Sequence, residues 1–310
     1  MDFLFVVIGL ILLVFGGDWL LKSAVGMSLR LNVPKIVIGM TVVSFATSAP
    51  ELIVSVKSAL DGFPDIALGN VVGSNIANIG LILGLVMIIS EMKIDFTFFK
   101  SDWPAMMIAS ILLYIMLFFG GDISRIEGGV LFVLLIGFVL LLLKNKPDTT
   151  DEEIPLDETM TTAKVIWFLV IGGLALWGGS ELLIKGAVNI AQLFGVSDRV
   201  IAVTVVAIGT SIPELAASII AALKKESSIS IGNVIGSNIF NILSVLGIAS
   251  LIHPIKLVDT QLMTFDILWM LFFAFILLPL VAMPKKGFLD RRAGIVLVFS
   301  YVLFVYLTFN

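Results

Sequence analysis

The sequence contains ten apolar stretches that are each long enough to cross a lipid bilayer. A membrane-spanning helix needs about 20 predominantly apolar residues, and such stretches lie at residues 3–24, 35–59, 66–90, 103–120, 127–143, 164–190, 198–223, 229–252, 264–283 and 291–308. Of the 310 residues, 59% are hydrophobic and 14% are charged, whereas soluble domains contain about 45–50% apolar and about 25% charged residues. We therefore predict an all-α integral membrane protein with ten transmembrane helices, surrounded by a lipid bilayer.

One connection between these stretches is long and polar. It runs from residue 144 to residue 162 and carries six acidic residues and two prolines, a composition typical of a solvated linker. We predict a first five-helix repeat at residues 1–143, an acidic cytoplasmic linker at 144–162 and a second five-helix repeat at 163–310.

The two halves share long motifs. A shift of 163 positions places TSAPEL (Thr47–Leu52) on TSIPEL (Thr210–Leu215), and GNVVGSNIANI (Gly69–Ile79) on GNVIGSNIFNI (Gly232–Ile242). Between residues 31–90 and 194–253, 27 of 60 positions are identical. Self-similarity of this extent indicates an internal duplication.

Basic residues predict how the repeats are oriented. If the N-terminus lies outside, the inner loops collect Lys22, Arg30, Lys35, Lys93, Lys100, Lys144, Lys146, Lys164, Lys224, Lys225, Lys285, Lys286, Arg291 and Arg292, and the outer loops hold Lys57, Arg125, Arg199 and Lys256. The positive-inside rule favours that orientation. Because each repeat has five helices, the second then crosses the membrane in the opposite direction, which is the inverted-repeat plan of secondary transporters. A net charge of −4 gives no reason to expect a nucleic-acid partner, and the absence of cysteine excludes a thiolate metal site.

Glu51 and Glu214 lie well inside apolar stretches at corresponding positions of the two repeats. A carboxylate at membrane depth costs several kcal/mol, so the default interpretation of such a residue is functional. Hydroxyl groups stand three and four residues earlier, on the same helix face: Thr47, Ser48, Thr210 and Ser211. Pro50 and Pro213 each remove a backbone donor, which is expected to free carbonyl oxygens near Ala46 and Gly209. Carboxylate, hydroxyl and carbonyl oxygens are the ligands of Ca²⁺.

The second motif adds uncharged polar groups four residues apart, and we interpret them as ion ligands or their hydrogen-bond partners: Ser74, Asn78, Ser237 and Asn241. Its glycines form small-xxx-small strips, which are expected to serve helix packing rather than direct ion contact: Gly69, Gly73, Gly232 and Gly236.

These duplicated motifs resemble the two α-repeats of the Ca²⁺/cation antiporter superfamily, and most closely its prokaryotic sodium/calcium exchanger branch. The resemblance covers essentially the whole chain. It implies alternating access and electrogenic exchange of about three Na⁺ for one Ca²⁺. By position, it implies ion ligands at Ser44, Thr47, Ser48, Glu51, Ser74, Asn78, Ala207, Thr210, Ser211, Glu214, Ser237 and Asn241, where Ser44 and Ala207 contribute backbone carbonyls.

Two positions depart from the family pattern. Ala46 stands where the family usually has glycine, as the second repeat does at Gly209. Asn241 stands where several relatives carry aspartate, including potassium-dependent ones, so the resemblance argues against K⁺ co-transport.

We therefore expect a Na⁺/Ca²⁺ antiporter that works as a monomer in the plasma (inner) membrane of a prokaryote. Na⁺ and Ca²⁺ would be its substrates, and no cofactor is expected. A Ca²⁺/H⁺ antiporter or another cation/Na⁺ antiporter is the main alternative, and a passive channel is a weaker one. An enzyme is disfavoured, because the duplicated hydroxyls and amides would have no evident task in a catalytic dyad. Asp18 and Glu181 lie at corresponding places near helix ends, where a solvated acid is at least as plausible as a gating group.

Overall fold

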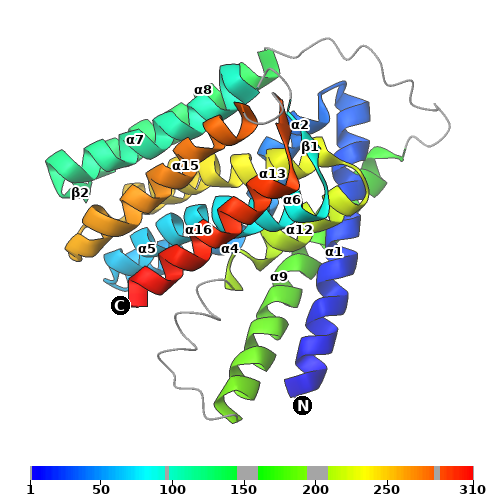
Figure 1. The fold of residues 1–310 in the computed structure, drawn as a ribbon, viewed down its shortest axis with the longest axis horizontal. Helices are drawn as coiled ribbons and strands as arrows, with labels where there is room; N and C mark the ends of the chain where they lie inside the picture. The colour runs from blue at the N-terminus through cyan, green and yellow to red at the C-terminus, as the bar shows by residue number, and fades with distance from the viewer. Residues whose placement is uncertain (1, 95–97, 145–159, 194–208, 283–286, 310) are drawn as a thin grey trace. The chain divides into compact units, whose positions relative to one another are not determined.

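The computed structural model describes residues 2–94, 98–144, 160–193, 209–282 and 287–309 (Figure 1). In this part of the chain, eight helices are long and apolar enough to cross a membrane. Lys35–Thr47 and Ala49–Leu60 make a ninth if the pair counts as one broken span. The stretch expected at 198–223 lies partly outside the described residues, and its described part, Ile212–Leu223, is a shorter apolar helix. The all-α, multi-pass architecture is confirmed, and the count of ten stays a prediction.

The described helices belong to two compact units, each of which draws on both halves of the sequence. The first unit comprises Met1–Thr47 and Leu143–Asn233, and the second comprises Ser48–Leu142 and Val234–Asn310. Segments that are distant in sequence therefore fold together within each unit.

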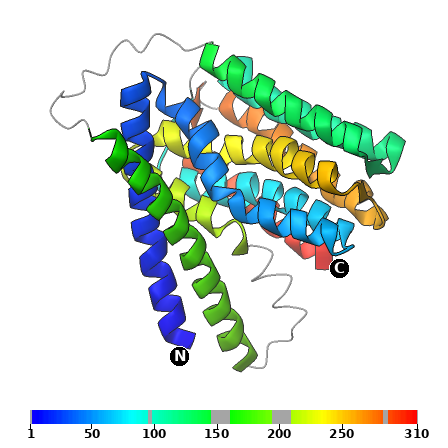
Figure 2. The ribbon, with the colours of Figure 1, turned by 180° about the vertical axis from the view of Figure 1, so that it is seen from behind.

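In the first unit, α1 (Asp2–Leu31) runs alongside α9 (Thr162–Leu193) in both views (Figures 1 and 2). Glycines line the contact. A Cβ atom on Gly9 would lie 2.8 Å from the Gly179 carbonyl oxygen, and one on Gly172 would lie 2.8 Å from the Leu20 nitrogen. Because lipid tails are as apolar as the side chains, close backbone approach of this kind is a main source of helix association in membranes.

The other described elements of the first unit are α12, which contacts α1, the beginning of α13 and three short consecutive helical segments. Their bounds are α2 (Lys35–Ile38), η1 (a π-helical segment, Gly39–Val43), α3 (Ser44–Thr47), α12 (Ile212–Leu223) and the beginning of α13 (Ser227–Phe240).

The second unit holds most of the remaining helices. They are α4 (Ala49–Leu60), α5 (Pro64–Ala77), η2 (Asn78–Leu83), α6 (Gly84–Ile89), η3 (Phe98–Asp102), α7 (Trp103–Gly120), α8 (Arg125–Lys144), the end of α13, η6 (Asn241–Leu246), α14 (Gly247–Ile252), η7 (Leu262–Asp266), α15 (Ile267–Ala282) and α16 (Arg291–Phe309). Among the described residues of this unit, four two-residue strands lie between the helices: β1 (Met92–Lys93), β2 (Asp122–Ile123), β3 (Ile255–Lys256) and β4 (Phe288–Leu289).

Local structure repeats together with the sequence. The most buried of the eight spans are Pro64–Ile89 and Ser227–Ile252, and each changes from α to π geometry at an asparagine, Asn78 or Asn241, 163 positions apart. The strands repeat as well, since β1 pairs antiparallel with β4, and β2 pairs antiparallel with β3. Elements of the two sequence repeats therefore pair with each other inside the second unit.

The membrane-spanning stretch expected at residues 35–59 is present as two helical parts, Lys35–Thr47 and Ala49–Leu60, bent by 47°. The helical backbone is interrupted at Ser48 (φ −85°, ψ 8°), and α4 starts at the next residue with Pro50 in its first turn. In the second repeat, Ser211 (φ −89°, ψ 6°) likewise precedes the start of a helix, α12, with Pro213 in its first turn. The physical reason is that proline fits the first turn of a helix, where no backbone donor is needed, better than its interior.

Candidate functional site

The two membrane-depth glutamates occupy first turns of helices. Glu51 lies in the first turn of α4, in the second unit, and Glu214 lies in the first turn of α12, in the first unit. Both side chains are 0% exposed. The helix breaks at Ser48 and Ser211 leave backbone N–H groups beside each carboxylate without intrahelical acceptors, and the positive end of the helix dipole stabilises negative charge there. The same break therefore creates a place where a buried carboxylate is tolerated.

A polar cluster accompanies Glu51 in the second unit. Its members are Ser74 and Asn78, at the junction of α5 and η2, and Ser237 and Asn241, at the junction of α13 and η6. All four are at most 2% exposed. Helix α4 contacts both α5 and η6, and α5 contacts η6, so the elements that carry these side chains meet.

Several atoms of this cluster are buried without a hydrogen bond in the described part of the chain. They are the Ser74 hydroxyl oxygen, both amide atoms of Asn78 and the Asn241 carbonyl oxygen Oδ1. Leaving a buried polar group unsatisfied costs about 1–3 kcal/mol, and such groups call for a specific explanation in a folded protein. Coordination of a cation would satisfy the oxygen atoms among them.

Two further asparagines hold the glutamate helices, and the sequence interpretation assigned them no role. The Asn70 amide nitrogen donates to the Glu51 backbone carbonyl at 3.3 Å and to the Ser55 hydroxyl at 3.0 Å. In the first unit, the Asn233 amide nitrogen donates to the Glu214 backbone carbonyl at 3.4 Å and to the Ser218 hydroxyl at 2.9 Å. The available signal was the recurrence of this amide, one residue after the first glycine of each GNVxG motif.

Asn233 also forms a hydrogen bond with Thr47, a predicted ion ligand in the first unit. Its Oδ1 accepts a hydrogen bond from the Thr47 hydroxyl at 3.1 Å, and that hydroxyl lies 3.3 Å from the Ser44 backbone carbonyl. The Ser44 hydroxyl lies 2.8 Å from the Gly39 backbone carbonyl and 3.0 Å from the Asn233 backbone carbonyl, and its single proton is shared between these two acceptors. These contacts tie α3 to α13 and hold the Thr47 hydroxyl in place.

Three predicted ligands of the second repeat remain, namely Thr210, Ser211 and Ala207. The Ser211 hydroxyl is buried and makes no hydrogen bond within the described residues. Thr210 is half-buried, and Ala207 lies outside the described residues. The expectation of a free carbonyl at Gly209 is wrong, because this oxygen accepts a hydrogen bond from the Ser180 hydroxyl of α9 at 2.9 Å. Pro213 has no backbone N–H to donate to the Gly209 carbonyl. The Ser180 hydroxyl, from another helix, donates to that carbonyl instead.

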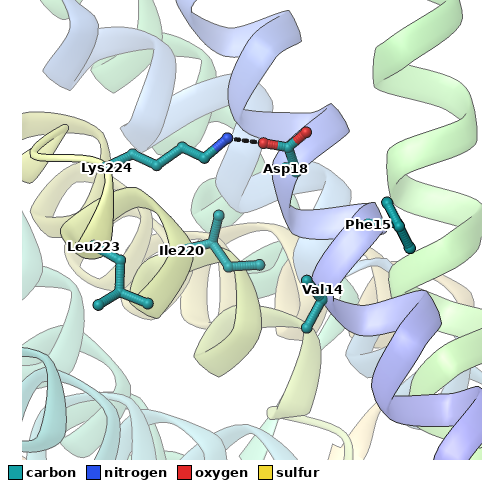
Figure 3. A pocket seen from close by; sticks show the side chains of 6 residues that line it. All are labelled: Val14, Phe15, Asp18, Ile220, Leu223 and Lys224. Atoms are coloured by element: carbon teal, nitrogen blue, oxygen red, sulfur yellow. Dashed lines mark hydrogen bonds and ion pairs between the residues drawn. The ribbon is translucent and has the colours of Figure 1, made fainter.

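Asp18 is ion-paired rather than freely solvated. Its carboxylate lies 2.8 Å from the Lys22 ammonium, and 19% of its side chain is exposed. It also bonds to Lys224 (Figure 3). The pair with Lys224 closes one side of a cavity of about 300 Å³ between α1 and α12, whose other lining residues are Val14, Phe15, Ile220 and Leu223. Glu181, its counterpart in the second repeat, is exposed. Asp18 therefore joins two helices of the first unit at the edge of this cavity.

Comparisons with known proteins agree with this arrangement. The family model described as "Sodium/calcium exchanger protein" matches residues 1–144 and 164–310. The putative antiporter CaxA of Alkalimonas amylolytica is 36% identical, with 99% of this chain and 98% of that protein covered. The sodium/calcium exchanger MaX1 of Methanosarcina acetivorans is 32% identical, with 99% and 98% covered.

A solved structure is similar over the same extent. It is the sodium-calcium exchanger NCX_Mj soaked with 2.5 mM Na⁺ and 0.1 mM Ca²⁺, which aligns with a TM-score of 0.83 at 31% identity. The alignment covers 98% of this chain and 97% of that one.

Proposed function

Because this chain belongs to the sodium/calcium exchanger family, we propose that it is a secondary active antiporter that exchanges Na⁺ for Ca²⁺. It is a multi-pass membrane transporter and not an enzyme. The observation that carries the ion assignment is the duplicated buried glutamate, each copy 0% exposed in the first turn of a helix and flanked by buried hydroxyl or amide groups. Oxygen-rich surroundings of this kind suit Na⁺ and Ca²⁺.

The proposed ligands are the twelve positions derived from the two motifs. The breaks at Ser48 and Ser211, the amide contacts of Asn70 and Asn233 and the unsatisfied atoms of Ser74, Asn78, Ser211 and Asn241 support them. The full set is Ser44, Thr47, Ser48, Glu51, Ser74, Asn78, Ala207, Thr210, Ser211, Glu214, Ser237 and Asn241.

Charge balance supports obligatory exchange. One Ca²⁺ or two Na⁺ neutralise two glutamates, so either load removes the buried negative charge. A third Na⁺ would leave one positive charge and couple transport to the membrane potential at about 2.3 kcal/mol per charge per 100 mV. An empty transporter would carry two uncompensated anions through a low-dielectric barrier, and the cost of several kcal/mol would prevent its return.

The architecture that we propose for this cycle is ten helices in two inverted five-helix repeats, with the N-terminus outside. The basic residues of the inner loops and the 163-residue recurrence of the breaks at Ser48 and Ser211 support it. Inverted repeats permit alternating access, because exchanging the conformations of two similar halves opens the site to the opposite side. The proposed location is the plasma membrane of a prokaryote, with the monomer as the working unit.

The test is ⁴⁵Ca²⁺ uptake by proteoliposomes loaded with Na⁺ and diluted into Na⁺-free buffer. Glu51→Gln and Glu214→Gln are compared with Glu181→Gln, which makes the same chemical change at an exposed glutamate of α9. We expect uptake that requires the Na⁺ gradient, disappears in the first two variants and persists in the third. Uptake driven equally well by a proton gradient would transfer the assignment to Ca²⁺/H⁺ exchange, and uptake without any counter-ion would indicate a channel. Absence of Ca²⁺ uptake under either gradient would refute calcium as the substrate.

A further inference from the structure

We propose that Asn75 is a positioning residue that turns the side-chain amide of Asn241 so that its carbonyl oxygen, and not its NH₂ group, faces the transported cation. The proposal rests on the function proposed above, since it requires Asn241 to be an ion ligand. Both residues lie in the second unit, on α5 and at the first position of η6. Asn75 is 1% exposed and Asn241 is 0% exposed.

The hydrogen bonds of Asn75 allow one orientation of each amide. Its Nδ2 donates to the Asn238 backbone carbonyl at 3.2 Å and lies 3.8 Å from the Met270 sulfur. A carbonyl oxygen and a thioether sulfur can only accept, so the atom that faces them must be the NH₂ group of Asn75. The opposite atom is therefore Oδ1, which can only accept, and the atom of Asn241 that lies 3.1 Å from it must be Nδ2. Oδ1 of Asn241 is then directed away from Asn75, and it is buried without a hydrogen bond in the described part of the chain.

The first repeat lacks this restraint at the matching position. Asn78 corresponds to Asn241, and Asn238 corresponds to Asn75, at the same 163-residue spacing. The Asn238 amide nitrogen, however, donates to the Val234 backbone carbonyl of its own helix at 2.8 Å. Within the described residues, both amide atoms of Asn78 have no hydrogen-bond partner. The duplicated motif therefore holds one ligand amide in a set orientation and leaves its counterpart free to turn.

This asymmetry has a chemical consequence for ion binding. An amide oxygen attracts a cation, whereas the NH₂ group directs two partially positive hydrogens at it. If the partner of Asn241 is removed, the amide can turn, and ion binding must then select the correct orientation. A ligand that is already correctly oriented binds more tightly because this reorganisation is avoided. Asn75 would thus raise the affinity for the ion without contacting it.

The test compares Asn75→Leu with Asn238→Leu in the Na⁺-gradient uptake assay. Both substitutions replace a 1%-exposed asparagine by a side chain of similar size, and each removes the bond that its own amide nitrogen donates to a backbone carbonyl. Only Asn75→Leu also removes the acceptor of the Asn241 amide. Loss of one such hydrogen bond corresponds to about a fivefold change in an equilibrium constant. We expect the KM for Ca²⁺ to rise about fivefold in Asn75→Leu at a nearly unchanged maximal rate, and to stay near the wild-type value in Asn238→Leu.

A second comparison separates positioning from general damage to the fold. In an Asn241→Asp background both side-chain oxygens are equivalent, so no amide orientation needs to be selected. There, Asn75→Leu should not raise the KM for Ca²⁺, because the Asn75 oxygen and the carboxylate are both acceptors and no favourable bond is lost. Asn75→Ala replaces Asn75→Leu if the leucine variant cannot be purified as a folded protein.

The outcomes distinguish this proposal from the proposed function. Wild-type protein that shows no Na⁺-driven Ca²⁺ uptake overturns the function and the positioning role together. Normal wild-type exchange with an unchanged KM in the Asn75 variant overturns the positioning role alone. Equal increases in the Asn75 and Asn238 variants, or an equal effect of Asn75→Leu in the aspartate background, also overturn it.

Discussion

The glycine contact between α1 and α9 makes a quantitative prediction, because two neighbouring glycines of α9 face different surroundings. A Cβ atom on Gly172 would lie 2.8 Å from the Leu20 nitrogen and 3.0 Å from the Gly16 carbonyl oxygen of α1. A Cβ atom on Gly173 would meet no heavy atom within 4 Å. Alanine at either position adds the same methyl group to the same helix. At position 172 the methyl group meets backbone atoms of α1, and at position 173 it enters open space.

The two alanine variants should differ in stability by the cost of separating the helices. At either position, alanine gains up to about 1 kcal/mol of helix propensity over glycine. At position 172 the contacting atoms belong to the backbone and cannot turn aside, so α1 must shift, and overpacking of this kind costs about 1–3 kcal/mol. We expect Gly173→Ala to be slightly more stable than the wild type, and Gly172→Ala to lie about 2 kcal/mol below Gly173→Ala.

Thermal unfolding in detergent measures this difference. For a chain of this size, about 2 kcal/mol corresponds to a melting-temperature difference of roughly 3 °C between the variants. Na⁺-driven Ca²⁺ uptake, measured on the same preparations, should be reduced in Gly172→Ala and retained in Gly173→Ala. Equal melting temperatures for the two variants would refute the close backbone contact between α1 and α9.

Two further measurements test ligand binding and the polar contacts of the first unit. Ca²⁺ added to Na⁺-free protein at about 100 times its Kd should stabilise the fold by about 2.7 kcal/mol, and the double variant Glu51→Gln/Glu214→Gln should lose this thermal shift; a shift of the same size in that variant would place Ca²⁺ elsewhere. Asn233→Leu removes two donated bonds and the acceptor of the Thr47 hydroxyl from a site that is 1% exposed. It should cost about 2–4 kcal/mol in thermal unfolding, whereas Asn238→Leu, which loses the single bond to Val234, should cost about 1 kcal/mol; equal losses would show that the Asn233 contacts contribute no more than that one bond.

The membrane architecture was predictable because bilayer thickness dictates the length of each apolar segment. The stretches expected at 66–90 and 229–252 correspond to spans at Pro64–Ile89 and Ser227–Ile252. Hydropathy is a property of consecutive residues and can be read without knowledge of the partner helices. The family was predictable for a similar reason, since long motifs that occur twice identify it without coordinates.

The backbone around the glutamates was predicted less well. Pro50 and Pro213 suggested free carbonyls within continuous spans, but each proline lies in the first turn of a helix that begins one residue after Ser48 or Ser211. Proline is compatible with a kink as well as with a first turn, so the sequence left both possibilities open. The pairing of the Gly209 carbonyl with Ser180 could not be foreseen, because the donor belongs to a different helix.

The sequence by itself determined that this protein lies in a lipid bilayer, that it is internally duplicated and which kinds of side chain could bind an ion. These properties depend on composition and on local spacing. The tertiary structure alone decided which of those side chains are held in place. Asn75 and Asn238 occupy the same position of the same motif, yet Asn75 bonds to the amide of Asn241 and Asn238 bonds to its own helix. A hydrogen bond between side chains 166 residues apart exists only once the chain has folded, so near-identical local sequences can hold the Asn241 amide in place and leave the Asn78 amide without a hydrogen bond in the described part of the chain.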